Sequence, residues 1–126
     1  MNKVISLLLC LGMMISVSHA ADPSRGPDLF ASNCRPCHSP DQGTKPDMYG
    51  MNLTLYGIIG RKAASVEGFF YSDAMKESGI TWTPELVKLF ITDPFVVLPE
   101  TRMMFFGLPS ETDREDLVEF LTTLNE

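Results

Sequence analysis

The spacing of apolar residues along the chain predicts four short helices. The clearest begins at residue 112, where a Thr-Asp-Arg-Glu capping box precedes apolar residues at helical intervals: Leu117, Val118, Phe120, Leu121 and Leu124. The other three are predicted over residues 26–34, 72–79 and 83–93. Proline or serine marks their starts, and glycine or a following proline marks the ends of the latter two.

Two long segments between these helices have neither a helical nor an alternating pattern. They cover residues 39–53 and 93–109 and contain several glycines and prolines. No run alternates strongly enough to predict a strand. Loops of this length are uncommon in a small domain unless they have a function, and wrapping a ligand would be one. The pattern therefore predicts an all-α fold with irregular loops around a ligand.

The first twenty residues are predicted to be a cleaved signal peptide. A positive start at residues 1–3 is followed by an apolar run over residues 4–17, which is too short to span a bilayer comfortably. Residues 18–20, Ser-His-Ala, have the small-x-small pattern of a signal peptidase site. We therefore expect one domain over residues 21–126, exported to the periplasm and without stable membrane insertion. An uncleaved anchor is the alternative.

Removal of this leader changes the charge of the chain. Lys3 is lost, so the 10 lysines and arginines become 9 against 16 aspartates and glutamates, and the net charge becomes −7. An acidic surface repels nucleic acid and anionic membranes, so neither is an expected partner. A domain of this size is marginal by itself, and a large cofactor would add to its core.

The stretch Cys-Arg-Pro-Cys-His, residues 34–38, carries the two cysteines and the one histidine that remain in the predicted mature domain. A thioredoxin-like dithiol would follow a strand in a βαβ unit, and no such unit is predicted. A structural zinc site needs four ligands, and this cluster offers three unless an acidic residue joins it. A disulfide between Cys34 and Cys37 would leave His38 without a role. Covalent haem attachment uses all three residues, because each thiol adds to one vinyl group and the histidine then lies under the iron.

The ligand on the other side of a haem iron would be a methionine. No second histidine remains, and a thioether is a soft ligand that raises the reduction potential. Met103 is favoured because it lies in the long irregular segment, and Met104 is its nearest rival. The other candidates in the mature chain are Met48, Met51 and Met75.

With these residues, the sequence resembles class I c-type cytochromes, of the mitochondrial cytochrome c and bacterial cytochrome c2 or c-550 type. The similarity runs from Gly26 to Glu126 and follows an ordered set of motifs: Gly26 with Phe30, the Cys-x-x-Cys-His motif, LYGIIGRKA at 55–63, EGFFYSDAM at 67–75, GITWTPE at 79–85, LPETRMMFFGL at 98–108 and TDREDLVEFL at 112–121. It implies the cytochrome c fold, with short helices wrapped around one covalently attached haem c per chain. Its Pro-x-Thr-Arg-Met part selects Met103 over Met104 as the ligand opposite His38.

The same resemblance implies roles for residues around the haem. Arg61, Tyr71 and Trp82 match positions that hydrogen-bond the haem propionates, and Thr101 matches a position that contacts a propionate or its local network. Carboxylates at the edge of an apolar pocket would be costly without such donors. Pocket-lining or core positions are matched by Leu55, Phe69, Leu86, Phe105 and Leu117.

Three departures from the family pattern lie close to the iron. Phe90 stands where the family usually has a tyrosine that hydrogen-bonds the methionine sulfur, and Met75 stands where an asparagine is common. Both changes remove polar groups, so we expect a reduction potential at the high end for this family. The proline whose carbonyl accepts the proton of the axial imidazole is missing, and Leu53 is the expected acceptor instead.

The rim expected around the haem edge departs most from the family. Where mitochondrial members carry a ring of lysines, only Arg102 keeps a charge among Asn33, Phe95, Arg102, Pro109 and Ser110. Electrostatic steering onto an acidic partner is therefore not expected. An apolar contact patch that includes Phe95, Phe106 and Pro109 is predicted in its place. The alternative is that these aromatic side chains pack against the loop.

These features predict a soluble, exported monomer that carries single electrons through a haem ligated by His38 and Met103. Its partners would be a quinol-oxidising complex, an oxidase or a periplasmic dehydrogenase. One alternative is a haem-bearing subunit or dedicated acceptor of a periplasmic dehydrogenase. Another is a haem enzyme or a ligand sensor, which would need an open or labile iron position.

Overall fold

The computed structural model describes residues 20–22 and 24–125. The predicted signal peptide, residues 1–20, therefore lies outside the described residues except for Ala20, and its cleavage stays a prediction. Five helices and two very short strands follow one another along the chain: α1 (Gly26–Asn33), β1 (His38–Ser39), β2 (Leu53–Thr54), α2 (Asp73–Glu77), α3 (Pro84–Phe90), α4 (Pro94–Val97) and α5 (Glu111–Thr123). The all-α prediction is confirmed apart from this one pair of strands.

The helix starts follow from side chains that cap free backbone amides. Ser72 accepts a hydrogen bond from the Met75 amide at the start of α2, and Thr83 accepts one from the Leu86 amide at the start of α3. A proline in the first turn supports α1, α3 and α4, because its fixed φ suits a helix and its missing N–H needs no partner there. The predictions of α1, α2 and α3 are therefore confirmed in position, although α3 ends at Phe90.

Two predictions about the second half of the chain were wrong. The last helix begins at Glu111, because the Ser110 hydroxyl accepts a hydrogen bond from the Asp113 amide and so caps it before the predicted Thr112 box. The segment predicted to be irregular over residues 93–109 contains α4. Its start is capped by Asp93, whose carboxylate accepts a hydrogen bond from the Phe95 amide.

The two strands were not predicted, since two residues are too few to show an alternating pattern. They form a parallel pair in which His38 faces Leu53 and Ser39 faces Thr54. The pair closes the long loop over residues 39–53 at its base. It therefore fixes where this loop leaves and re-enters the domain.

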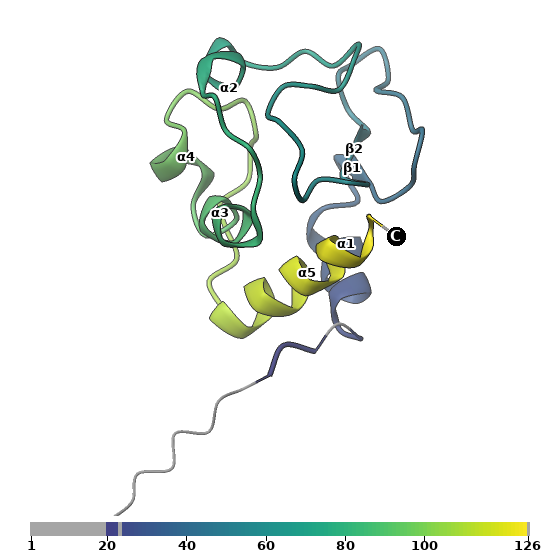
Figure 1. Ribbon diagram of the computed structural model, residues 1–126, viewed down its shortest axis with the longest axis vertical. Helices are drawn as coiled ribbons and strands as arrows, with labels where there is room; N and C mark the ends of the chain where they lie inside the picture. Colours follow the sequence, from purple (N-terminus) through teal and green to yellow (C-terminus); the bar gives the residue numbers. More distant parts are fainter. Residues whose placement is uncertain (1–19, 23, 126) are drawn as a thin grey trace, which may run out of the picture.

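Helix α5 is the element against which the rest of the helical core packs. It lies along one side of the molecule, with α1 crossing it and α3 packing on it (Figure 1). Gly26 allows the close approach of α1, and the rings of Phe30 and Phe120 meet edge to face with centroids 5.7 Å apart. Leu117 and Leu121 of α5 are almost fully buried beside them.

A fully buried carboxylate ties the start of the domain to α5. Asp116 is completely buried and accepts hydrogen bonds from the backbone amide of Asp22 and from the guanidinium of Arg25. Arg25 also forms an ion pair of 2.7 Å with Asp113. A buried carboxylate is tolerated only with such partners, so this cluster holds Asp22 and Arg25 on the helix.

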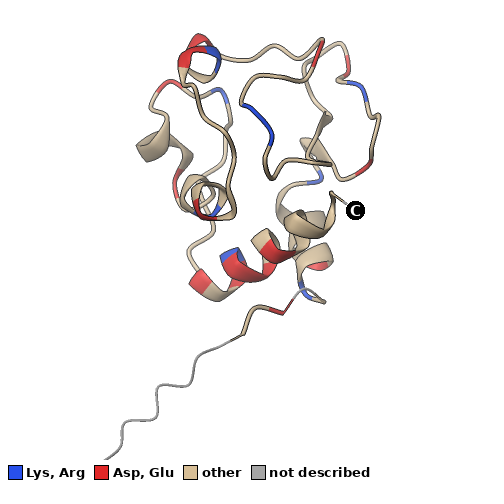
Figure 2. Ribbon diagram, viewed as in Figure 1, with Lys and Arg blue, Asp and Glu red and all other residues tan. Residues whose placement is uncertain are grey.

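Acidic side chains gather along α5, as Figure 2 shows. Its first turn carries Glu111 and Asp113, where carboxylates interact favourably with the helix dipole. Among the described residues, no helix has both the length and the apolar character needed to cross a membrane.

We predict that replacing Gly26 by alanine destabilises the protein by about 2 to 3 kcal/mol. An added Cβ would lie 2.2 Å from Cβ of Phe120 and 2.8 Å from the carbonyl oxygen of Asp116, so α1 and α5 would have to separate. Urea unfolding of the purified protein measures this loss. The control is Ser32→Ala on the exposed side of α1, which should change the free energy of unfolding by less than about 0.5 kcal/mol. Equal stability of the two variants would contradict the close packing.

Candidate functional site

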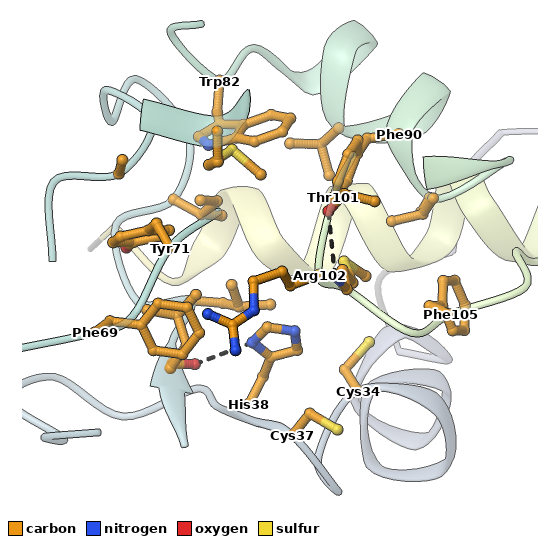
Figure 3. A pocket seen from close by; sticks show the side chains of 18 of the residues that line it. Cys34, Cys37, His38, Phe69, Tyr71, Trp82, Phe90, Thr101, Arg102 and Phe105 are labelled. Carbon is orange, nitrogen blue, oxygen red and sulfur yellow. Dashed lines mark hydrogen bonds between the residues drawn. The ribbon is translucent and has the colours of Figure 1, made fainter. Parts of the chain in front are cut away.

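A cavity of about 430 Å³ lies between the helices and the loops. Most of the side chains around it are apolar. In Figure 3, Cys34, Cys37 and His38 lie along one side of it, and Trp82, Phe90 and Thr101 lie along the other. The structure brings together around this one cavity every residue predicted for the site: Cys34, Cys37, His38, Leu55, Arg61, Phe69, Tyr71, Trp82, Phe90, Thr101, Met103 and Phe105.

The two thiols and the imidazole are held together by a tight turn that follows α1. The backbone amides of Cys37 and His38 both donate to the carbonyl of Cys34, at 3.0 and 2.8 Å. Both cysteines are free thiols. Burial, followed by the neighbouring Cys37, raises the pKa of the Cys34 thiol to about 12, so this thiol stays protonated at neutral pH. The turn presents three reactive groups to one side of the cavity.

A single hydrogen bond determines which nitrogen of His38 is available. Nδ1 lies 3.2 Å from the carbonyl oxygen of Leu53, and because a carbonyl only accepts, Nδ1 carries the proton. Burial, together with the nearby charge of Arg61, lowers the pKa of His38, while the bond to Leu53 acts in the opposite direction. The imidazole is therefore neutral at pH 7, and Nε2 keeps a free lone pair. The expectation that Leu53 is the acceptor is confirmed.

Met103 and Met104 have different surroundings. Met103 is half-buried against the core, whereas Met104 is 75% exposed. The hydroxyl of the buried Thr101 accepts a hydrogen bond of 3.2 Å from the Met103 amide. The hydrogen bond between its amide and Thr101 therefore fixes the backbone that carries the half-buried Met103 thioether, whereas the adjacent Met104 thioether is exposed.

Arg61 places a positive charge at the cavity while fixing a turn. Its guanidinium donates to the carbonyls of Thr54 at 2.8 Å and Tyr56 at 3.1 Å. Burial lowers its pKa, and the nearby Tyr71 opposes that effect. Because a guanidinium has five N–H groups, these two bonds leave donors for a ligand.

The strand-like segment around Trp82 connects the Arg61 turn to α3. The Trp82 amide donates to the carbonyl of Arg61 at 2.9 Å, and the Trp82 carbonyl accepts from the Gly60 amide at 2.7 Å. The indole also packs on Phe90, with ring centroids 5.0 Å apart. Tyr71 lies against Phe69 at 4.7 Å, and its hydroxyl accepts from the Val66 amide at 3.3 Å. These contacts fix the aromatic walls of the cavity.

The charges around the cavity are all positive. Arg61, Lys62 and Arg102 line it, and no aspartate or glutamate of the described residues does. Among the described residues, no group of three or more His, Cys, Asp or Glu side chains is placed so that it could hold a metal ion. A large apolar ring with two carboxylates and a metal that takes nitrogen and sulfur ligands fits this set of residues.

Several cavity residues were not predicted from the sequence. Lys62 and Phe70 lie at its exposed edge, where Phe70 is 71% exposed, and Met51, named above only as an alternative ligand, reaches it from the loop over residues 39–53. Lys62 could have been found from its place beside Arg61. Phe70 and Met51 carry no local signal, because their contact with the cavity depends on the loop conformation. Leu86 packs against the core without lining the cavity, and Leu117 does both.

Known proteins similar to this chain identify what such a cavity holds. No protein-family model matches the chain. It is 36% identical to the cytochrome c2 of Blastochloris viridis over 125 residues, which is 99% of this chain and 95% of that protein. It is 42% identical to the cytochrome c2 of Rhodoblastus acidophilus over 103 residues, 82% of this chain and 92% of that protein.

The chain belongs to the cytochrome c family. It is also 40% identical to the cytochrome c-550 of Ancylobacter novellus over 106 residues, 82% of this chain and 95% of that protein. Cytochromes of this family carry one covalently attached haem c and are electron carriers rather than enzymes. The cavity, the Cys-x-x-Cys-His turn and the family agree on haem c as the cofactor.

We predict that Thr101→Val loosens the segment that carries Met103. Valine has nearly the same shape but removes the acceptor for the Met103 amide, which should lower the free energy of unfolding by about 1 to 2 kcal/mol. Exchange of the Met103 amide hydrogen should become about tenfold faster. Thr101→Ser keeps the hydroxyl and should exchange at nearly the wild-type rate. An unchanged rate in the valine variant would show that this hydrogen bond does not hold the segment.

Proposed function

We propose that this cytochrome is an exported carrier of single electrons whose haem iron has His38 and Met103 as its two axial ligands. The observation that carries the proposal is the convergence of two thiols, a neutral imidazole and the half-buried thioethers of Met75 and Met103 on the same cavity. When bound, the haem supplies an iron that cycles between the ferric and ferrous states. The residues described below hold it.

Cys34 and Cys37 are proposed to attach the haem. Each S–H adds across one vinyl C=C, so that a thioether bond forms and the thiol proton goes to the neighbouring carbon. Such bonds prevent loss of the cofactor during short contacts with partners. His38 would bind through Nε2, which is the nitrogen left free by the Nδ1 bond to Leu53.

Met103 is proposed as the sixth ligand because it is half-buried against the core, whereas Met104 is exposed. Met75 is also half-buried at the cavity, but it does not stand in the Pro-x-Thr-Arg-Met motif that selects Met103. A thioether is a soft ligand that favours ferrous iron and raises the potential. Phe90 and Trp82, both buried, exclude water beside it and offer no acid or base. With both axial positions held, little has to move when the charge on the iron changes.

The positive and polar residues of the cavity are proposed to bind the two haem propionates. Arg61 has N–H groups beyond those used on Thr54 and Tyr56, and the Tyr71 hydroxyl can still donate while it accepts from Val66. Trp82 and Thr101 would complete this set. Within the part of the chain that the structure describes, no carboxylate lines the cavity to compete for these donors.

Export to the periplasm is part of the proposal. It is supported by the leader pattern over residues 1–20, and covalent haem attachment in bacteria takes place outside the cytoplasm. The partners would then be a quinol-oxidising complex, an oxidase or a periplasmic dehydrogenase.

The edge of the cavity is proposed as the contact surface for these partners. Phe70 is 71% exposed, Met104 75% and Phe106 87%. Phe95, predicted to belong to this patch, is half-buried, and Pro109 is exposed. A partner that docks on a largely apolar surface is held by buried apolar area rather than by charge. The rate of its association should therefore depend weakly on salt.

We predict that Met103→Leu removes the sixth ligand and Met104→Leu does not. The weak far-red absorption band that an iron–thioether bond gives in the ferric state should be present in the wild type and in Met104→Leu. It should be lost in Met103→Leu, and carbon monoxide should then bind the ferrous protein readily at neutral pH. Loss of the band in Met104→Leu alone would show that Met104, and not Met103, is the ligand. Absence of the band from the wild type would overturn the proposed ligation.

We also predict that the exposed rim decides the rate of electron transfer to a partner. The reduced protein is mixed with membrane vesicles of the source organism, and oxidation of the haem is followed by absorbance. Phe70→Ser should lower the second-order rate constant about fivefold or more, since it removes an apolar contact. Val96→Ser, at an equally exposed side chain of α4 that does not line the cavity, should lower it less than about twofold.

The salt dependence tests the same surface independently. The wild-type rate constant should change less than about threefold between about 0.02 and about 0.2 M salt. A steep fall with salt, together with equal effects of Phe70→Ser and Val96→Ser, would contradict an apolar docking rim.

A further inference from the structure

Asn52 has a backbone conformation that few side chains favour. Its φ is 68°, in the left-handed region, and the only other described non-glycine residue with positive φ is Ala64. Asparagine tolerates this region better than most residues, and β-branched residues tolerate it poorly. The side chain of Asn52 is exposed. The conformation therefore has to be explained by what the backbone does at this position.

The backbone at Asn52 connects the axial histidine segment to the carbonyl that holds it. The Asn52 amide donates to the Cys37 carbonyl at 2.9 Å, one residue before His38. The next carbonyl, that of Leu53, accepts the proton of His38 Nδ1 at 3.2 Å. Asn52 thus directly precedes Leu53, whose carbonyl is the acceptor. Its amide is hydrogen-bonded to Cys37, which directly precedes His38.

The chain on the other side of Asn52 is closed on itself. The Asp47 carboxylate accepts hydrogen bonds from the amides of Tyr49 and Met51, at 2.9 and 2.8 Å, and the Asp47 amide donates to the Met51 carbonyl at 3.0 Å. Strand β2 begins directly afterwards at Leu53. A single residue therefore has to turn the chain from this closed loop into the parallel pair, and the left-handed conformation does so.

We propose that Asn52 is a positioning residue for the His38 imidazole. Its left-handed backbone aims the Leu53 carbonyl at Nδ1 and thereby sets the orientation and the electron-donating strength of the ring. The proposal rests on ligation of the iron by His38. A stronger bond from Nδ1 makes the imidazole more basic, which favours ferric iron, so weakening the bond raises the reduction potential.

The chain offers variants that separate this role from general strain. Asn52→Val disfavours the left-handed conformation at the turn, whereas Asn52→Gly retains it without the side chain. Gly43→Val introduces the same kind of strain in the same loop, at φ 76° and with nothing within 4 Å of an added Cβ, but away from Leu53. Asn52→Ala gives the comparison with less strain if the valine variant does not yield folded, haem-loaded protein.

The experiment follows exchange of the His38 Nδ1 hydrogen with D₂O by NMR in the ferrous, haem-loaded proteins, alongside the reduction potential of each. Exchange should be about tenfold faster in Asn52→Val than in the wild type, and the reduction potential should be higher. A β-branched residue is disfavoured in the left-handed backbone conformation, and the free-energy cost corresponds to a change of about tenfold in the stability of the turn. Asn52→Gly and Gly43→Val should stay within about twofold of the wild-type rate and keep its potential, even where Gly43→Val unfolds more easily.

Ligation by His38 and positioning by Asn52 are tested by different signals. If the wild-type spectrum lacks the ring-current-shifted resonances of an axial imidazole, ligation by His38 is wrong. If those resonances are present but exchange and potential in Asn52→Val equal those of the wild type, His38 remains the ligand and Asn52 has no positioning role. The same conclusion follows if Gly43→Val shows the same changes as Asn52→Val.

Discussion

The fold depends on filling a large apolar cavity at the centre of a small chain. Among the described elements, contacts between helices involve α1, α3, α4 and α5, whereas α2 contacts no other described helix and lines the cavity through Met75. Buried side chains such as Trp82, Phe90 and Leu117 point at this space rather than only at one another. A haem in the cavity is therefore part of the hydrophobic core, and its binding free energy adds to the stability of the folded state.

The helices were predictable where a cap and an apolar pattern agree locally. Ser72 and Thr83 cap the helices expected from them. The start of α5 was misplaced because two overlapping capping patterns occur, and the structure uses Ser110. The missed helix α4 has a readable signal, Asp93 before Pro94, but only one helical turn to support it. The strands β1 and β2 pair across the thirteen residues 40–52, so no local pattern could show them.

The candidate site was more predictable than the loops that build it. Every predicted site residue lines one cavity. Cys34, Cys37 and His38 were predicted from the chemistry of their own motif, whereas the residues of the cavity walls were predicted from the resemblance to class I c-type cytochromes. The sequence did not show what holds them: the carbonyls that accept from Arg61, or the Thr101 bond to the Met103 backbone. These contacts depend on chain geometry, which side-chain identity alone does not determine.

The pairing of α1 with α5 has a consequence for biosynthesis. One partner, Gly26–Asn33, is made well before the other, Glu111–Thr123. The Asp116 carboxylate that binds Asp22 and Arg25 belongs to the later helix. Helix α1 therefore cannot make these contacts until α5 has been synthesised. The turn that carries Cys34, Cys37 and His38 directly follows α1, so its place in the domain is also fixed only after α5 is present.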